Sequence, residues 1–273
     1  MNVSIPLSSS PKNEGLSVRR AQTASAAIEI QQYRRRTIFA IWAAAALPMA
    51  ALAWIAAPAL SHHLSGEGNI PIAKALIALL TIGLVWQFAL VAILVWREQR
   101  SFRWSVLREA LWLRAPRSPR TGRVGGRLWL VLIPLVVLFG TEELIPSLPF
   151  PASHDMGSLL SSHAGHVFLH GAWGWFAVLV ALWVFNTVLG EELLFRGLLL
   201  PRMNGAFGKR DWLANGVLFA CYHLHMPWAI PTALADTFIL AYPTKRYRSA
   251  WIGIAVHSAE SVVFAVIGLT LLL

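Results

Sequence analysis

Long apolar runs dominate the pattern of hydrophobic and polar positions along this chain. An α-helix needs about 20 apolar residues to cross a bilayer, and three clear runs meet or approach this length, at 37–60, 72–96 and 128–145. Four less regular runs follow, at 176–200, 212–222, 229–241 and 251–273. The pattern predicts an all-α, multi-pass transmembrane helical bundle of about seven helices (six to eight), of which the fifth and sixth are the least certain.

Composition supports a membrane protein. Of 273 residues, 56% are hydrophobic and only 13% are charged, whereas a soluble domain carries about 25% charged residues. The net charge of +10 could indicate nucleic-acid binding, but the basic residues lie in short segments between apolar runs, which is typical of topology determinants. We therefore expect no nucleic acid partner. The single cysteine, Cys221, cannot form an intrachain disulfide and is interpreted as a small buried hydrophobe.

The distribution of Lys and Arg predicts the orientation, because cytoplasmic loops carry the excess of these residues. Segment 97–127 holds nine arginines and two glutamates, and the turns at 202–210 and 245–248 are also basic. The intervening connections are not basic. This alternation predicts a cytoplasmic N-terminus and an external C-terminus.

Four regions follow from these patterns. Residues 1–36 are predicted to be a flexible cytoplasmic tail, which is not cleaved because the apolar run after it is longer than that of a signal peptide. Residues 37–96 form two transmembrane helices, 97–127 a basic cytoplasmic loop, and 128–273 the bundle that carries the candidate site. Within the loop, apolar and basic residues interleave at 101–114, which predicts an interfacial amphipathic helix that anchors the chain rather than binding substrate.

The chemistry concentrates in the stretch Gly-Glu-Glu-Leu-Leu-Phe-Arg-Gly at 190–197. It puts Glu191, Glu192 and Arg196 inside an apolar segment of membrane length. Ionisable groups in a bilayer are costly and normally mark a functional site. Glu192 and Arg196 are one helical turn apart and can pair, and Glu191 with a water molecule is a plausible general base.

Two histidines on other helices lie at a similar predicted depth. With a rise of about 1.5 Å per residue, Glu191, His223 and His257 all lie about 12 to 18 Å from the cytoplasmic edge of the hydrocarbon core. Such matching depths are required of a shared intramembrane site. His257 and Ser261 are four residues apart, so they share a helix face and could donate hydrogen bonds to an oxyanion.

Structural and metal-binding interpretations compete with this hypothesis. A lone intramembrane histidine is usually a structural hydrogen-bonding group, which is our interpretation of His166, His170, His225 and Asp236. Zinc bound by Glu191, His223 and His257 is conceivable, but no His-Glu-x-x-His occurs, and we expect no cofactor and no metal. Neither the Gly-x-Ser-Gly of a serine nor the Gly-x-Gly-Asp of an aspartyl intramembrane protease is present.

Three motifs together resemble a known family. Glu191-Glu192-x-x-x-Arg196, then Phe219-x-x-x-His223, then His257 after a basic turn are similar to those of the CPBP family of intramembrane proteases, over residues 97–273. This family includes CAAX prenyl endopeptidases and bacterial bacteriocin-processing and immunity proteins.

The resemblance implies a role for each motif residue. Glu191 would activate water, supported by Glu192 and oriented by Arg196, while His223 would share in activation and His257 would stabilise the oxyanion. The family usually has Asn where this chain has Ser261, and serine donates a single hydrogen bond over a shorter reach.

The implied activity is that of a glutamic-type endopeptidase in the bacterial inner (cytoplasmic) membrane. It would hydrolyse a membrane-associated peptide or protein near an embedded or anchored terminus, such as a leader peptide or a C-terminal sorting tail, and its partners would be that substrate and the lipid bilayer. One alternative is a non-catalytic binding or immunity protein of the same fold. A transporter that uses Glu191, Glu192 and His223 as a proton relay is a second alternative.

Overall fold

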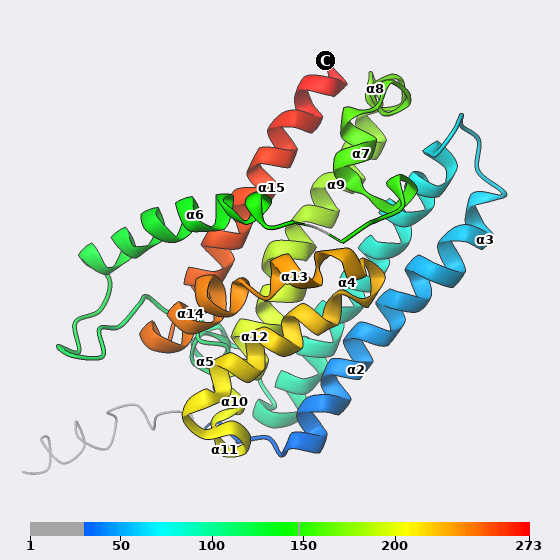
Figure 1. Cartoon of the computed structure of the whole chain (residues 1–273). Helices are drawn as coiled ribbons and strands as arrows, with labels where there is room; N and C mark the ends of the chain where they lie inside the picture. Colours follow the sequence, from blue (N-terminus) through cyan, green and yellow to red (C-terminus); the bar gives the residue numbers. More distant parts are fainter. Residues whose placement is uncertain (1–29, 147) are drawn as a thin grey trace, which may run out of the picture.

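A computed structural model describes residues 30–273 with the exception of 147. The described residues form helices and connecting turns without a strand (Figure 1). Four helical stretches have the length and hydropathy to cross a membrane, so the predicted transmembrane helical bundle is confirmed. They are Arg35–Ser61, which combines α2 (Arg35–Ala51), η1 (Leu52–Ala56) and α3 (Ala57–Ser61); α4 (Ile70–Gln99); Trp173–Arg202; and α15 (Ala250–Leu272).

The third of these stretches contains the acidic motif and is built from several helical types. It consists of α9 (Trp173–Val184), η5 (Phe185–Gly190), η6 (Leu193–Leu199) and α10 (Leu200–Arg202), with η5 and η6 in π-helical geometry. It lies between α4 and α15 in Figure 1. These long helices have little segregation of apolar from polar positions, because one side of each faces the bundle and the other the hydrocarbon.

The ends of the long helices meet at two opposite ends of the bundle. At one end, the Tyr33 amide donates to the Arg202 carbonyl at 2.9 Å and the Ala250 amide to the Trp112 carbonyl at 2.9 Å. At the other end, the Gly171 amide donates to the Leu272 carbonyl at 3.0 Å. The first described residues and the C-terminus therefore lie at opposite ends (Figure 1), as an external C-terminus and a cytoplasmic N-terminus require; which end faces the cytoplasm stays a prediction.

The runs at 212–222 and 229–241 are helical, but they are not two spanning helices. Instead, α12 (Asp211–Tyr222) enters the bundle and the chain returns through several short helices, so that Lys245 forms an ion pair with Asp211 at the end where α12 began. A helix of 12 residues is about 18 Å long, which is less than the hydrocarbon thickness of about 30 Å. The return path comprises η8 (His223–His225), η9 (Pro227–Ala229), α13 (Ile230–Ala233), η10 (Thr237–Ala241) and α14 (Tyr242–Tyr247).

Local sequence explains this re-entrant hairpin. Prolines at 227, 231 and 243 each remove a helical hydrogen-bond donor and limit the length of any one helix. The two arms approach closely at Gly216, where an added Cβ would lie 2.6 Å from the Thr237 Cα. A hairpin that enters and leaves on one side does not change the side on which the C-terminus lies.

The predicted span at 128–145 is also shorter than expected. Its apolar part forms η2 (Gly126–Val131) and α6 (Leu132–Gly140), which together make an apolar helix too short to count among the four long ones. The chain then turns through η3 (Glu142–Leu144), followed by Pro146. The helix ends because Thr141 and Glu142 introduce polar groups and proline restricts the residue before it.

The two basic regions also differ from expectation. The helix predicted within 101–114 is only α5 (Trp104–Ala110), and Leu111, Trp112 and Leu113 after it are buried in the bundle rather than facing lipid. Of the predicted tail 1–36, residues 1–29 lie outside the described part. The described part, residues 30–36, is attached to the bundle rather than free. Gln32 donates to the Pro201 carbonyl at 3.0 Å and accepts from the Gly205 amide at 3.0 Å.

Candidate active site

The two glutamates lie where the long third helix departs from α-helical geometry. Glu191 and Glu192 separate the π-helical segments η5 and η6, and π-bulges frequently accompany functional sites. Gly190 permits this packing, because a Cβ there would lie 2.5 Å from the Phe185 carbonyl oxygen and 3.3 Å from that of Leu84 on α4. The acidic pair therefore faces the interior of the bundle at a point where the backbone is irregular.

Glu192 is the centre of a buried charge cluster. One of its carboxylate oxygens, Oε1, lies 3.1 Å from Arg196 Nη1 and 3.1 Å from His257 Nδ1. Glu192 and Arg196 are fully buried and His257 is nearly so. The other carboxylate oxygen of Glu192, Oε2, has no hydrogen-bond partner in the described part of the chain. The local pairing predicted for Glu192 and Arg196 is present, and α15 supplies a third member.

A glycine on α15 makes room for this cluster. An added Cβ at Gly253 would lie 2.4 Å from Glu192 Oε2 and 3.2 Å from Arg196 Cγ. Since real Cβ contacts are not this short, any larger residue must displace the carboxylate or the helix. The sequence signal is weak, because Gly253 is one of 19 glycines, and its importance follows only from the packing of α15 against η6.

Glu191 is oriented by a separate chain of polar groups. It is 2% exposed and its carboxyl group is hydrogen-bonded to the Tyr222 hydroxyl. That hydroxyl accepts a 2.6 Å hydrogen bond from Gln87 Nε2 on α4. Sequence reasoning missed both residues, although a glutamine inside the apolar run 72–96 was a signal that could have been used.

Phe219 of α12 links the motifs through its ring. The Arg196 guanidinium carbon lies 3.8 Å from the ring centroid, a close cation–π contact. The rings of His223 and His257 lie edge-on to it at 5.0 and 6.2 Å. The aromatic position of the Phe-x-x-x-His motif therefore packs against members of the other two motifs.

His223 lies at the end of α12, in the middle of the re-entrant hairpin. Its Nδ1 is 3.0 Å from the Phe219 carbonyl oxygen, which can only accept, so Nδ1 carries the proton and Nε2 is left as a potential acceptor. The ring is half-buried and stacks on His225 at 5.6 Å. His223 is thus near the charge cluster through Phe219, with a defined tautomer.

Ser261 is hydrogen-bonded to the helix of the acidic motif. Its hydroxyl donates to Thr187 Oγ1 at 3.3 Å, and Ser258 donates to the same atom at 3.2 Å. Thr187 is one turn before Glu191 on the same helix. The residue expected to assist His257 is therefore held by a hydroxyl group one turn away from the Glu192–His257 contact.

Further carboxyl groups surround the cluster from other elements. Asp236 of the hairpin and Glu142 of η3 are mostly buried and interact electrostatically with His257 and Arg196. Glu260 Oε2 lies 3.8 Å from His257 Nε2. The sequence interpretation gave Asp236 a structural role and did not connect Glu142 to the site, because nothing local reveals that α6, which leads into η3, packs against α15.

The predicted metal-free character is not tested by this arrangement. In the described ranges, no three His, Cys, Asp or Glu side chains converge as a metal ion would need. The hypothetical zinc ligands Glu191, His223 and His257 are accordingly not brought together as one ligand set. The absence of a cofactor remains a prediction.

Comparison with known families supports the assignment reached from the motifs. Residues 172–263 match the family model described as type II CAAX prenyl endopeptidase Rce1-like, and this region contains all three motifs. The match is to a family of CAAX-type intramembrane proteases, in agreement with the CPBP resemblance, and the four long apolar helices make the chain an integral membrane protein. No curated protein and no solved structure matches the chain.

Proposed function

We propose that this protein is a glutamic-type intramembrane endopeptidase. The observation that carries the proposal is the buried cluster in which Glu192 contacts both Arg196 and His257 at 3.1 Å, directly beside the buried Glu191. Ionisable groups inside a membrane protein are energetically costly and normally mark a functional site. The Rce1-like match at 172–263 supports a hydrolase of this type.

In the proposed reaction, Glu191 is the general base. It takes a proton from a water molecule as the water oxygen bonds to the carbon of the scissile carbonyl. The resulting tetrahedral intermediate then loses the amine, which receives the proton as the C–N bond breaks. No covalent enzyme intermediate is formed. The Gln87 and Tyr222 contacts fix the carboxyl group of Glu191 in one orientation.

Glu192 supports this chemistry through Arg196 and through His257, which in this scheme is protonated on both ring nitrogens. Arg196 and His257 contact the same oxygen of Glu192, so the imidazole ring is oriented by its Nδ1 and its Nε2 is the group that would donate to the oxyanion. His223, whose Nδ1 is bonded to the backbone, would help to hold the water through Nε2. Ser261 has no direct part in this scheme, because its hydroxyl is bonded to Thr187.

We further propose that the substrate is a membrane-associated peptide or protein in the bacterial inner membrane, cut near its embedded or anchored terminus. The N-terminus of the enzyme would face the cytoplasm. The basic connections at the end of the bundle that holds Arg202 and Ala250 support this orientation. The reaction needs no cofactor in this scheme.

The decisive experiment compares cells that carry Glu191→Gln with cells that carry the native protein. Mass spectrometry of membrane peptides should reveal one terminus that stays uncut in the variant, and purified native protein should cut the corresponding peptide at least about 10²-fold faster than the variant. Glu67→Gln is the matched control, since Glu67 is exposed in the turn before α4. Identical cleavage by Glu191→Gln would refute the assignment.

Metal analysis of the active, purified protein tests the cofactor proposal separately. Activity should survive chelators, and zinc should be far below one ion per chain. Stoichiometric zinc together with loss of activity on chelation would overturn the metal-free scheme, even if Glu191→Gln were inactive.

One observation favours a second candidate, a non-catalytic binding or immunity protein of the same fold. Ser261 replaces the family's usual amide and is bonded to Thr187, which leaves His257 without that second donor. A binding protein would retain its cellular phenotype in Glu191→Gln, because a neutral isostere preserves shape. Retained phenotype without any processed peptide would establish this second function.

A further inference from the structure

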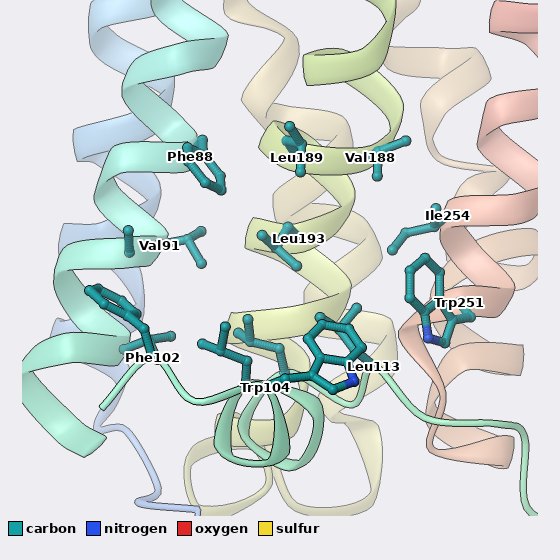
Figure 2. A pocket seen from close by; sticks show the side chains of 14 residues that line it. Phe88, Val91, Phe102, Trp104, Leu113, Val188, Leu189, Leu193, Trp251 and Ile254 are labelled. Atoms are coloured by element: carbon teal, nitrogen blue, oxygen red, sulfur yellow. The ribbon is translucent and has the colours of Figure 1, made fainter. Parts of the chain in front are cut away.

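An apolar groove of about 280 Å³ opens on the side of the bundle beside the candidate site (Figure 2). It lies between α4, the segment around α5, the helix of the acidic motif and α15. Figure 2 shows side chains from all of these elements directed toward one space. Representative lining residues are Phe88 and Val91 of α4, Leu189 and Leu193 of the acidic helix, and Trp251 and Ile254 of α15.

Exposed arginines lie next in sequence to residues that line this groove. α4 ends at Gln99, and the next residue, Arg100, has a left-handed conformation with φ of 50°. The chain folds back there, so that Phe102 stacks on Trp96 at 5.2 Å. Phe102 lines the groove. Arg100 and Arg103 flank it in sequence and are exposed, as is Arg97 one turn earlier on α4.

The juxtaposition of a hydrocarbon-lined groove and these guanidinium groups selects one kind of occupant. Arginines next to a membrane-embedded surface attract anionic headgroups, and Trp104, which lines the groove and is 58% exposed, is a residue type that favours the membrane interface. One turn of a substrate helix, about 5.4 Å long and 10 to 12 Å across with its side chains, occupies roughly 400 to 600 Å³, which exceeds the groove volume of about 280 Å³. An acyl chain is thinner and can lie in the groove along part of its length.

We propose that this groove binds one acyl chain of an anionic glycerophospholipid whose phosphate is held by Arg100 and Arg103. The bound chain would contact Leu193, adjacent to Glu192, and Ile254, three residues before His257. The lipid would therefore stabilise the relative position of the two helices that form the charge cluster. This binding does not depend on the proposed peptidase activity.

Native mass spectrometry of the purified full chain tests the headgroup preference. Phosphatidylglycerol and phosphatidylcholine with identical acyl chains are offered in equal amounts. Phosphatidylglycerol should be retained preferentially, and Arg100→Ala with Arg103→Ala should lower its retention by about fivefold per arginine. The matched control is Arg120→Ala with Arg123→Ala, which removes two exposed arginines of the same loop. Equal retention of both lipids, or equal loss in the control, would overturn the proposal.

Photo-crosslinking tests the position of the acyl chain. Phosphatidylglycerol with a diazirine in one chain should label peptides that contain 88–95 and 188–193. Ala92→Trp, which fills the groove, should abolish this labelling, whereas Ile93→Trp on the exposed side of α4 should not. Uniform labelling of all lipid-facing helices, or labelling unaffected by Ala92→Trp, would show that the groove holds no specific lipid. Crosslinks to a co-purified peptide instead of the lipid would assign it to a protein partner.

Discussion

Two fully buried arginines, Arg196 and Arg202, lie on the same helical stretch and have opposite surroundings. Every side-chain nitrogen of Arg202 donates a hydrogen bond. Nε donates to both oxygens of Glu98 and Nη2 to one of them, at 2.7 to 3.1 Å. Nη1 donates to the carbonyls of Ala110 and Leu198 at 2.9 Å each. Arg196 has one ion contact at 3.1 Å and a ring beneath it, and none of its nitrogens makes a well-aligned hydrogen bond among the described residues.

The difference separates a charge that ties several elements together from one that the proposed reaction could use. Arg202 joins α4, the last residue of α5 and the chain before α2, since Glu98 also accepts from the Tyr33 hydroxyl. Burial and the neighbouring carboxylate raise the pKa of Tyr33, so the hydroxyl keeps its proton and stays a donor. Buried groups of a stable fold are normally satisfied, and Arg196 is among the described residues whose buried polar atoms lack a hydrogen-bond partner.

The largest expected effect is on stability, from Arg202→Met. It leaves Glu98 buried without its partner, which should lower the free energy of unfolding by about 3 to 5 kcal/mol. Thermal unfolding of the purified protein, followed by tryptophan fluorescence, measures the loss. The double variant with Glu98→Met should recover part of it, because both charges are then absent. A double variant no more stable than Arg202→Met would mean that the pair is not the cause.

Arg196→Met should reverse the pattern, with a large effect on activity and a small one on stability. Arg196 holds Glu192, which in turn orients His257, and the loss of such positioning costs about 10²-fold in kcat. The destabilisation should be less than half that of Arg202→Met, because Glu192 keeps its contact with His257 at 3.1 Å. Cleavage of the peptide identified with Glu191→Gln provides the assay. Arg196→Lys keeps the charge but not the planar fork and should restore activity only in part. Near-native activity in Arg196→Met would show that Arg196, like Arg202, has only a structural role.

Gly253→Ala tests whether the cluster needs its close packing. The added methyl would meet Glu192 Oε2 at 2.4 Å, so we expect a destabilisation of about 1 to 3 kcal/mol together with a lower kcat. Gly174→Ala in α9 is the matched control, because an added Cβ there meets nothing within 4 Å. Its unfolding temperature and activity should equal those of the native protein.

The smallest effect is expected from Tyr222→Phe, which removes the hydroxyl between Gln87 and Glu191. A lost hydrogen bond of this kind is worth about 0.5 to 1.5 kcal/mol, or a fall of about 2- to 12-fold in kcat with KM unchanged. Tyr242→Phe is the control, since Tyr242 is 41% exposed on α14. A rise in KM without a fall in kcat would assign Tyr222 to substrate binding rather than to orienting Glu191.

The local pattern of the sequence was sufficient for much of the fold. Apolar run lengths predicted the four long helices, because hydrocarbon thickness dictates helix length wherever a segment crosses. The same argument predicted spans at 128–145, 212–222 and 229–241 that the structure replaces with a short helix and a re-entrant hairpin. Hydropathy cannot distinguish residues that face lipid from residues packed inside protein, and both produce apolar runs.

In the site too, some contacts follow from the local sequence and others do not. Contacts within one helix follow from sequence spacing alone. The pairing of Glu192 with Arg196 could therefore be predicted, because the two residues are four positions apart. Contacts between helices depend on how each helix is rotated and packed, which no local pattern contains. Only the tertiary structure therefore assigned His257 to Glu192, Ser261 to Thr187 and Tyr222 to Glu191.

The sequence by itself determined that this is a helical membrane protein with charges inside apolar segments, and its motifs resemble those of the protease family whose model matches residues 172–263. The tertiary structure decided which buried arginine is saturated and which is not, because that depends on the partners that other helices present. Arg202 and Arg196 look equivalent in the printed sequence. They differ because Glu98 reaches one of them from α4, whereas Phe219 and Glu192 are the groups that face the other.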